Sequence, residues 1–162
     1  MARAKPARMQ IPPHSGSDPK ILIFRALSLG DMLCVVPALR ALRAAMPRAR
    51  VSLCGLAWAA EFAAHYPAYI DEFIEFPGYP GLAERDPDLS GLPLFLKRMQ
   101  ERRFDLAIQM HGSGRITNPL VACFGATRMA GYFEPGAYCP DAGSFLPHPD
   151  RKAEIWRHIA LM

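Results

Sequence analysis

The chain has 162 residues, 51% of them hydrophobic and 21% charged, and a formal net charge of +4 at pH 7. This length is typical of one domain, and the apolar fraction is large enough for a packed core, which excludes a largely disordered chain. Residues 1–20 hold four basic residues against one acidic residue, so the rest of the chain is nearly neutral. A nearly neutral domain argues against nucleic acid as a partner, because that binding needs clustered Lys and Arg.

Residues 1–19 form a basic segment that we expect to be a flexible leader. They lack the apolar central region of a signal peptide, and no later segment approaches the ~18 uninterrupted apolar residues of a transmembrane helix. We therefore expect a cytoplasmic protein. A few cations without an apolar anchor allow at most a peripheral contact with the inner face of the membrane.

The first strand and helix are the clearest signals in the chain. Residues 21–24 are a continuous apolar run, which predicts a strand over 20–25 that is covered on both faces. Apolar residues then recur at helical spacing, which predicts a helix over 31–46 that ends before Pro47. Gly30 lies between the two elements and permits a tight turn or the close approach of a ligand.

The later elements alternate in the same way. The patterns predict strands at 50–55, 72–76, 104–110 and 128–132, helices at 58–66, 92–103 and 119–124, and a loop at 77–91. The strand at 72–76 alternates apolar and acidic residues, so we expect it near a sheet edge. Alternating strands and helices predict an α/β fold with a doubly wound, Rossmann-like parallel sheet over residues 20–150.

Asp31 follows the first strand at the position where open α/β sheets bind their ligands. It lies near the first turn of the predicted helix, where the helix dipole favours its ionised form. A charged carboxylate beside a crevice is a candidate general base. Ser28 and Asp31 can equally be helix caps that satisfy backbone N–H groups and touch no substrate. On these residues alone, both interpretations stay open.

The sequence motifs give little support to dinucleotide binding, nucleotide hydrolysis, metal binding or a hydrolase triad. A dinucleotide-binding turn needs three glycines and an acid after the second strand, whereas this chain has one glycine in that turn and no acid at 50–56. A Walker A motif is also missing. The four cysteines form no Cys-x-x-Cys pair, so we expect no metal. A hydrolase triad of Ser28, His111 and Asp31 is possible, but the Gly-x-Ser-x-Gly motif is absent.

Three segments carry a resemblance to a known family. The first is Arg25–Asp31 (RALSLGD), followed by Pro37–Arg43 (PALRALR). The second is Arg102–Gln109 (RRFDLAIQ) with His111–Arg115 (HGSGR), and the third is Phe124–Arg128 (FGATR) with Gly131 and Tyr132. Together they resemble the family 9 glycosyltransferases, the lipopolysaccharide heptosyltransferases and their relatives, from about Lys20 to the end of the chain.

The resemblance implies the N-terminal, acceptor-side domain of a two-domain GT-B enzyme about twice this length. It implies inverting transfer of a sugar from a nucleotide-sugar co-substrate, with ADP-heptose one candidate, to a lipopolysaccharide-type or lipid-linked glycan. The Asp of the family's Leu-Gly-Asp turn is the catalytic base, which corresponds to Asp31 here. No cofactor is implied, and the donor site would lie in the second half.

The loop from His111 to Arg115 is the second candidate for function. It follows the strand at 104–110, so it should emerge at the same sheet edge as Ser28, Gly30 and Asp31. Gly112 exposes backbone N–H groups, Ser113 and His111 can donate hydrogen bonds, and Arg115 can pair with a carboxylate or phosphate. Ser28, Gly30, His111, Gly112, Ser113 and Arg115 are therefore the predicted substrate-binding residues. Alternatively, the glycines only build a turn and Ser113 caps the next helix.

Residues 151–162 predict a C-terminal helix with Ile155, Ile159 and Met162 on one face, a stripe that requires a partner surface. In the family a segment here leads toward the second domain. In this chain we expect the helix to fold back on the sheet, to pair with another copy, or to stay exposed. An alternative function is therefore a non-catalytic or incomplete acceptor-binding module, or a split-enzyme half that needs a separate donor-binding domain.

Overall fold

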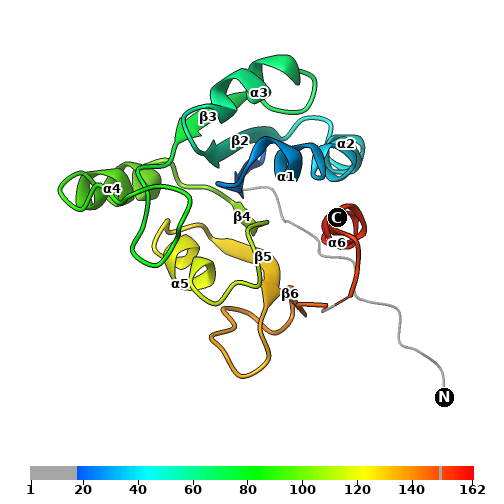
Figure 1. Ribbon diagram of the computed structural model, residues 1–162. Helices are drawn as coiled ribbons and strands as arrows, with labels where there is room; N and C mark the ends of the chain where they lie inside the picture. Colours follow the sequence, from blue (N-terminus) through cyan, green and yellow to red (C-terminus); the bar gives the residue numbers. More distant parts are fainter. Residues whose placement is uncertain (1–17, 150) are drawn as a thin grey trace.

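A six-stranded parallel sheet organises the computed structural model, which describes residues 18–149 and 151–162 (Figure 1). The strands are β1 (Lys20–Phe24), β2 (Arg50–Gly55), β3 (Glu72–Glu75), β4 (Leu106–Gln109), β5 (Arg128–Phe133) and β6 (Phe145–Pro147). The helices are α1 (Leu29–Leu33), α2 (Val36–Ala45), α3 (Ala59–His65), α4 (Leu92–Glu101), α5 (Thr117–Ala122) and α6 (Glu154–Ile159). Almost all of the predicted leader lies outside the described residues.

The order of the strands creates one natural binding crevice. The order is β3-β2-β1-β4-β5-β6 and all neighbours pair in parallel, which confirms the predicted doubly wound, Rossmann-like α/β fold with β3 at one edge. From β1 the chain first builds outward through β2 and β3, and then returns to add β4 on the other side of β1. The carboxyl ends of β1 and β4 therefore flank the switch point, where such sheets bind ligands.

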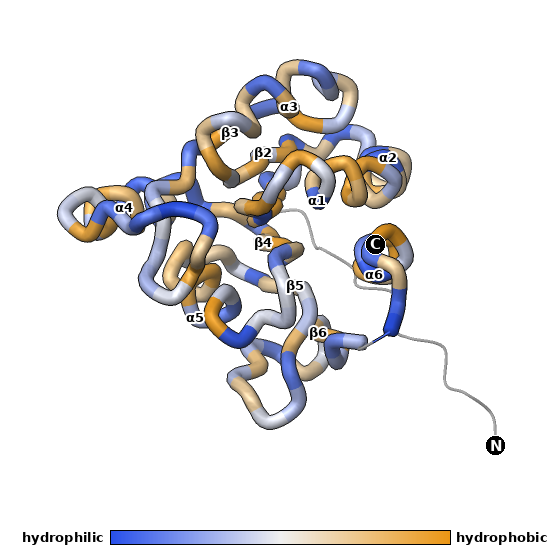
Figure 2. The backbone as a smooth tube through the Cα atoms, viewed as in Figure 1, coloured by the Kyte–Doolittle hydropathy of each residue, from blue (hydrophilic) through white to orange (hydrophobic). Residues whose placement is uncertain are grey.

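The core lies on both faces of the sheet because successive strand side chains point to opposite sides. In β1, Ile21 and Ile23 pack with residues of α1, α2 and α3, whereas Leu22 and Phe24 pack with residues of α4 and α5. All four side chains are fully buried, as a parallel strand between two helical layers requires. Figure 2 shows hydrophobic residues along the central strands and the inner sides of the helices.

The helix predicted over 31–46 is two helices. α1 ends at Leu33 and α2 begins at Val36, with Pro37 in its first turn. Proline has no N–H to donate to the carbonyl four residues earlier, so a continuous helix would lose that bond. The chain instead turns through short bonds from Cys34 N to Asp31 O (3.2 Å) and from Val35 N to Met32 O (3.1 Å). This break makes α1 a separate one-turn helix that carries Asp31.

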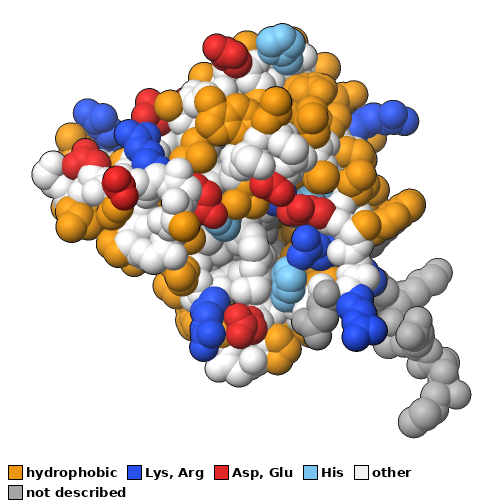
Figure 3. Space-filling model, viewed as in Figure 1, with side chains coloured by type: hydrophobic (Ala, Val, Ile, Leu, Met, Phe, Trp, Pro, Cys, Tyr) orange, Lys and Arg blue, Asp and Glu red, His pale blue; other side chains and the backbone are white. Residues whose placement is uncertain are grey.

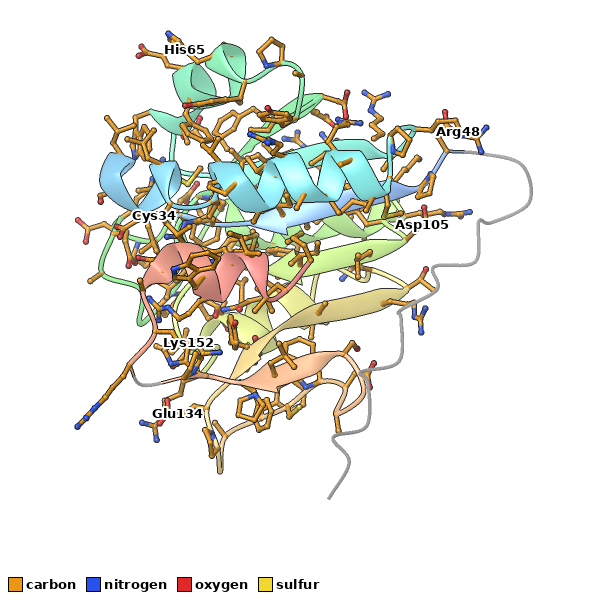
Figure 4. All side chains as sticks on the ribbon, turned by 90° about the vertical axis from the view of Figure 1, so that its right-hand side faces the viewer. Cys34, Arg48, His65, Asp105, Glu134 and Lys152 are labelled. Atoms are coloured by element: carbon orange, nitrogen blue, oxygen red, sulfur yellow. The ribbon has the colours of Figure 1, made fainter. Side chains whose placement is uncertain are left out.

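The C-terminal helix folds back beside α2, which is one of the three alternatives left open by the sequence (Figure 4). Its contact face differs from the expected apolar stripe. His158 is the buried residue of α6, whereas Ile155, Trp156 and Met162 are exposed. Polar side chains therefore provide much of the contact between α6 and the domain.

Within the described residues, no helix is both long and apolar enough to cross a membrane.

The short strand β6 was not predicted from the sequence. It has only three residues, Phe145 to Pro147, too few to show the alternation typical of a strand. Its pairing with residues 131–133 of β5 extends the sheet. Two polar segments that follow, around His148 and Glu154, are thereby brought to the carboxyl end of the sheet.

Candidate active site

The carboxyl ends of β1 and β4 bring the two predicted functional loops together. The backbone N–H of Ala26, after β1, donates a hydrogen bond to Nδ1 of His111, after β4, over 3.2 Å. Figure 3 looks onto this side of the molecule and shows acidic side chains across its middle, with histidine side chains visible below them. Ionisable groups therefore gather at the switch point.

Asp31 lies in the first turn of α1 with its side chain half-exposed. The Ser28 hydroxyl donates to Oδ2 of Asp31 over 2.7 Å, and Ser28 makes no side-chain bond to a backbone N–H of the helix. This hydrogen bond, with the charge of Arg25, holds the pKa of Asp31 below its usual value. Asp31 is therefore an ionised, solvent-accessible carboxylate at neutral pH. Gly30 beside it is exposed, and open space surrounds the position that a Cβ would occupy.

Arg25 is the first residue after β1, and its side chain is fully buried. Its Nε and Nη2 both donate to the main-chain oxygen of Asp31, over 3.2 and 2.8 Å. Its Nη1 donates to the carbonyl of Met110, and its Nη2 also contacts Oε1 of Glu154 over 2.6 Å. One guanidinium thus joins the ends of two strands, the turn that carries Asp31, and α6.

His111 is buried and stacks on Phe24, with ring centroids 5.6 Å apart. Because Nδ1 accepts the Ala26 N–H, the proton of the neutral ring lies on Nε2, which is 3.4 Å from Oε1 of Glu84. Burial lowers the pKa of His111 and outweighs the opposing charge of Glu84. The ring is therefore neutral at pH 7 and joins the 77–91 loop to the sheet edge.

The rest of this loop turns toward β5. Gly112 and Gly114 have positive φ angles of +62° and +90°, which glycine adopts without strain. Ser113 Oγ donates to Glu134 over 3.2 Å, and the largely exposed Arg115 lies 3.8 Å from the same carboxylate. Figure 4 shows Glu134 at the same end of the molecule as Cys34 and Lys152, opposite Arg48 and Asp105.

The predicted site residues therefore form two groups. Ser28, Gly30 and Asp31 lie on the β1 side, whereas Ser113 and Arg115 share Glu134 on the β5 side, and His111 lies between them. The hydrolase triad does not form. Both ring nitrogens of His111 face Ala26 and Glu84 instead of Ser28.

Sequence reasoning missed three carboxylates of this edge, Glu84, Glu134 and Glu154. Glu84 and Glu134 come from segments distant in sequence from their partners, and no periodicity marks them. Glu154 has helical spacing to Arg157 and His158, but its main partner, Arg25, is 129 positions away. Arg25 carried a usable signal, because a charged residue directly after a fully apolar strand needs a special environment. In the described part of the chain, no group of three or more His, Cys, Asp or Glu residues is arranged to hold a metal ion.

Comparison with solved structures identifies the fold. A family 9 glycosyl transferase from Veillonella parvula superposes with a TM-score of 0.64 at 20% identity, covering 90% of this chain and 40% of that one. E. coli heptosyltransferase WaaC with ADP gives a TM-score of 0.63 at 20% identity, covering 88% of this chain and 45% of that one. E. coli ADP-heptose lps heptosyltransferase II gives 0.63 at 20% identity, with 88% and 39% covered.

At the level of sequence, neither a family model nor a curated protein matches. The chain spans less than half the length of these solved relatives. Over the part that it spans, it has the fold of the family 9 GT-B glycosyltransferases.

Proposed function

We propose that this chain is the acceptor-side domain of an inverting glycosyltransferase of the heptosyltransferase type, with Asp31 as its general base. The observation that carries the proposal is an ionised and accessible carboxylate at the switch point of a sheet that has the family 9 fold. Sugar transfer needs such a group beside the acceptor hydroxyl. The proposed donor is a nucleotide-sugar, because the similar E. coli enzyme was solved with ADP and with an ADP-heptose analogue.

In this mechanism Asp31 removes the proton of the acceptor hydroxyl as the oxygen attacks the anomeric carbon. The bond from that carbon to the nucleotide breaks, and the nucleotide leaves on the opposite face, which inverts the configuration. The lowered pKa of Asp31 keeps the carboxylate unprotonated at neutral pH, so it is ready to accept the proton. General-base assistance of this kind typically accelerates a reaction by about 10²–10⁴-fold.

The test is Asp31→Asn in the chain joined to the donor-binding half of a family 9 enzyme. Transfer from ADP-heptose to a lipopolysaccharide-type acceptor should fall at least ~100-fold while the fold is retained. Asp18→Asn is the matched control, because Asp18 is an exposed carboxylate that precedes the amino end of β1. Turnover of Asp31→Asn within a few-fold of the unmodified protein would leave Asp31 as a helix cap.

The His111–Arg115 loop is the proposed acceptor-binding element. Arg115 is largely exposed and only loosely paired with Glu134 at 3.8 Å, so it can reach an acidic group of the acceptor. Arg115→Ala should therefore raise the KM for the acceptor more than the KM for the donor. An equal change for both substrates would argue for a general structural effect.

Residues 1–162 span only 39–46% of the similar glycosyltransferases, so we propose that these residues, tested alone, bind the acceptor without catalysing transfer. We expect the chain by itself to bind nucleotide-sugar weakly and to show no transfer. Isothermal titration with ADP-heptose tests this expectation, and micromolar binding by a monomer in sedimentation would contradict it.

A further inference from the structure

Arg25 is a fully buried cation whose charge is compensated from the other end of the chain. Among the described residues, Glu154 of α6 is the carboxylate within ion-pair distance of it, at 2.6 Å, although the two residues are 129 positions apart. A buried charge that loses its partner carries a large desolvation penalty. The position of α6 is therefore tied to the environment of Arg25.

Arg25 binds the main-chain oxygen of Asp31, and the Asp31 carboxylate makes its hydrogen bonds with other residues. Nε and Nη2 both donate to the main-chain oxygen of Asp31, whereas Oδ2 accepts the hydroxyl of Ser28. The guanidinium nevertheless acts on the Asp31 carboxylate through its charge. Without Glu154, Asp31 is a carboxylate whose charge can compensate the buried cation, because the two charges already interact.

Other ionisable groups surround Arg25, Glu154 and Asp31. On α6, Arg157 lies 3.8 Å from Glu154, and His158 lies 3.4 Å from the same oxygen. Burial lowers the pKa of His158 to about 4, so it is neutral at pH 7. His111, from the loop after β4, is also neutral at this pH. The carboxylates next to Arg25 are those of Glu154 and Asp31, and Glu84 lies 3.4 Å from His111 at the border of the cluster. The second guanidinium, that of Arg157, lies 2.7 Å from Nε2 of His148.

We infer that Glu154 is a positioning residue for Asp31: it neutralises Arg25, so that Arg25 binds the peptide oxygen of Asp31 and leaves the carboxylate free to accept a proton. The inference rests on the proposed role of Asp31 as the base. Glu154 acts on Asp31 in two ways. It forms an ion pair with Arg25, and its side chain also makes a hydrogen bond with Asp31 that helps to lower the pKa of Asp31. The C-terminal helix thereby becomes part of the candidate active site.

The test is the titration of Asp31 in the full 162-residue chain, followed by the NMR signal of its carboxyl carbon. Glu154→Gln keeps the shape of the side chain and removes its charge. The pKa of Asp31 should fall below its value in the unmodified protein. Arg25 then acts on Asp31 alone, and the glutamine amide can still donate the hydrogen bond that Glu154 makes with Asp31. Glu61→Gln, an exposed change on α3, is the matched control and should leave the titration unchanged. An unchanged or raised Asp31 pKa in folded Glu154→Gln overturns the inference.

A double variant keeps the test valid if Glu154→Gln does not fold. Arg25→Met with Glu154→Gln removes the buried charge of Arg25 and the half-buried charge of Glu154, an exchange that proteins often tolerate. The Asp31 pKa should then rise above its value in the unmodified protein, since the cation is gone, and an unchanged value would overturn the inference. These titrations do not depend on turnover. An active Asp31→Asn enzyme would refute the proposed function without altering them.

Discussion

Replacing His158 with glutamine should make the protein less sensitive to acid. His158 is buried on α6, and its Nδ1 has no hydrogen-bond partner, as expected for a neutral ring. Burial, with the charge of Arg25 next, lowers its pKa from 6.5 to about 4. In the unfolded chain the ring titrates near its ordinary value and binds a proton more readily.

The magnitude follows from proton linkage. Well above pH 6.5 both states are unprotonated, so His158 leaves the free energy of unfolding independent of pH there. As the pH falls from 6.5 toward 4, the unfolded state binds the proton and the native state does not, so stability is lost. The loss from His158 alone is about 2 kcal/mol at pH 5 and at most about 3 kcal/mol at pH 4. Glu154, whose pKa is also lowered, adds a loss of the same sign.

Urea unfolding followed by circular dichroism at pH 7, 6, 5 and 4 measures the effect. The difference in unfolding free energy between the unmodified protein and His158→Gln should change steadily below pH 6.5, in favour of the variant. His65→Gln, at an exposed position of α3, is the control and should follow the unmodified protein. Parallel curves for His158→Gln and the unmodified protein would refute the assignment of a neutral, buried histidine.

Two further predictions concern the loops of the candidate site. Gly114→Ala should lower the free energy of unfolding by at least about 2 kcal/mol, since φ is +90° and a Cβ would collide with the carbonyl of Tyr132. Gly112 also has a positive φ, but open space surrounds it, so Gly112→Ala should lower the free energy of unfolding by less, about 1–2 kcal/mol, in chemical denaturation. Equal losses in the two variants would show that the contact with Tyr132 does not destabilise Gly114→Ala. Ser28→Ala should raise the pKa of Asp31 in an NMR titration, because its hydroxyl is the main group that lowers that pKa. An unchanged titration would show that other groups set it.

The local pattern of the sequence was sufficient for the fold class and for the position of Asp31. The apolar run of β1 and the helical spacing after it depend only on neighbouring residues, and a strand followed by a helix puts Asp31 at the carboxyl end. The break before α2 could also have been predicted, because Pro37 lacks the N–H that a continuous helix needs. The three residues of β6 were too few to form a pattern.

The tertiary structure decided which charges meet. Glu154 compensates Arg25 only because β5 and β6 extend the sheet and α6 then returns beside α2. Likewise, Glu84 reaches His111 only because the 77–91 loop crosses the carboxyl edge. Contacts between residues far apart in the chain depend on strand order and on the paths of the connections. Sequence periodicity reports local geometry and burial, so it cannot predict contacts between residues far apart in the chain.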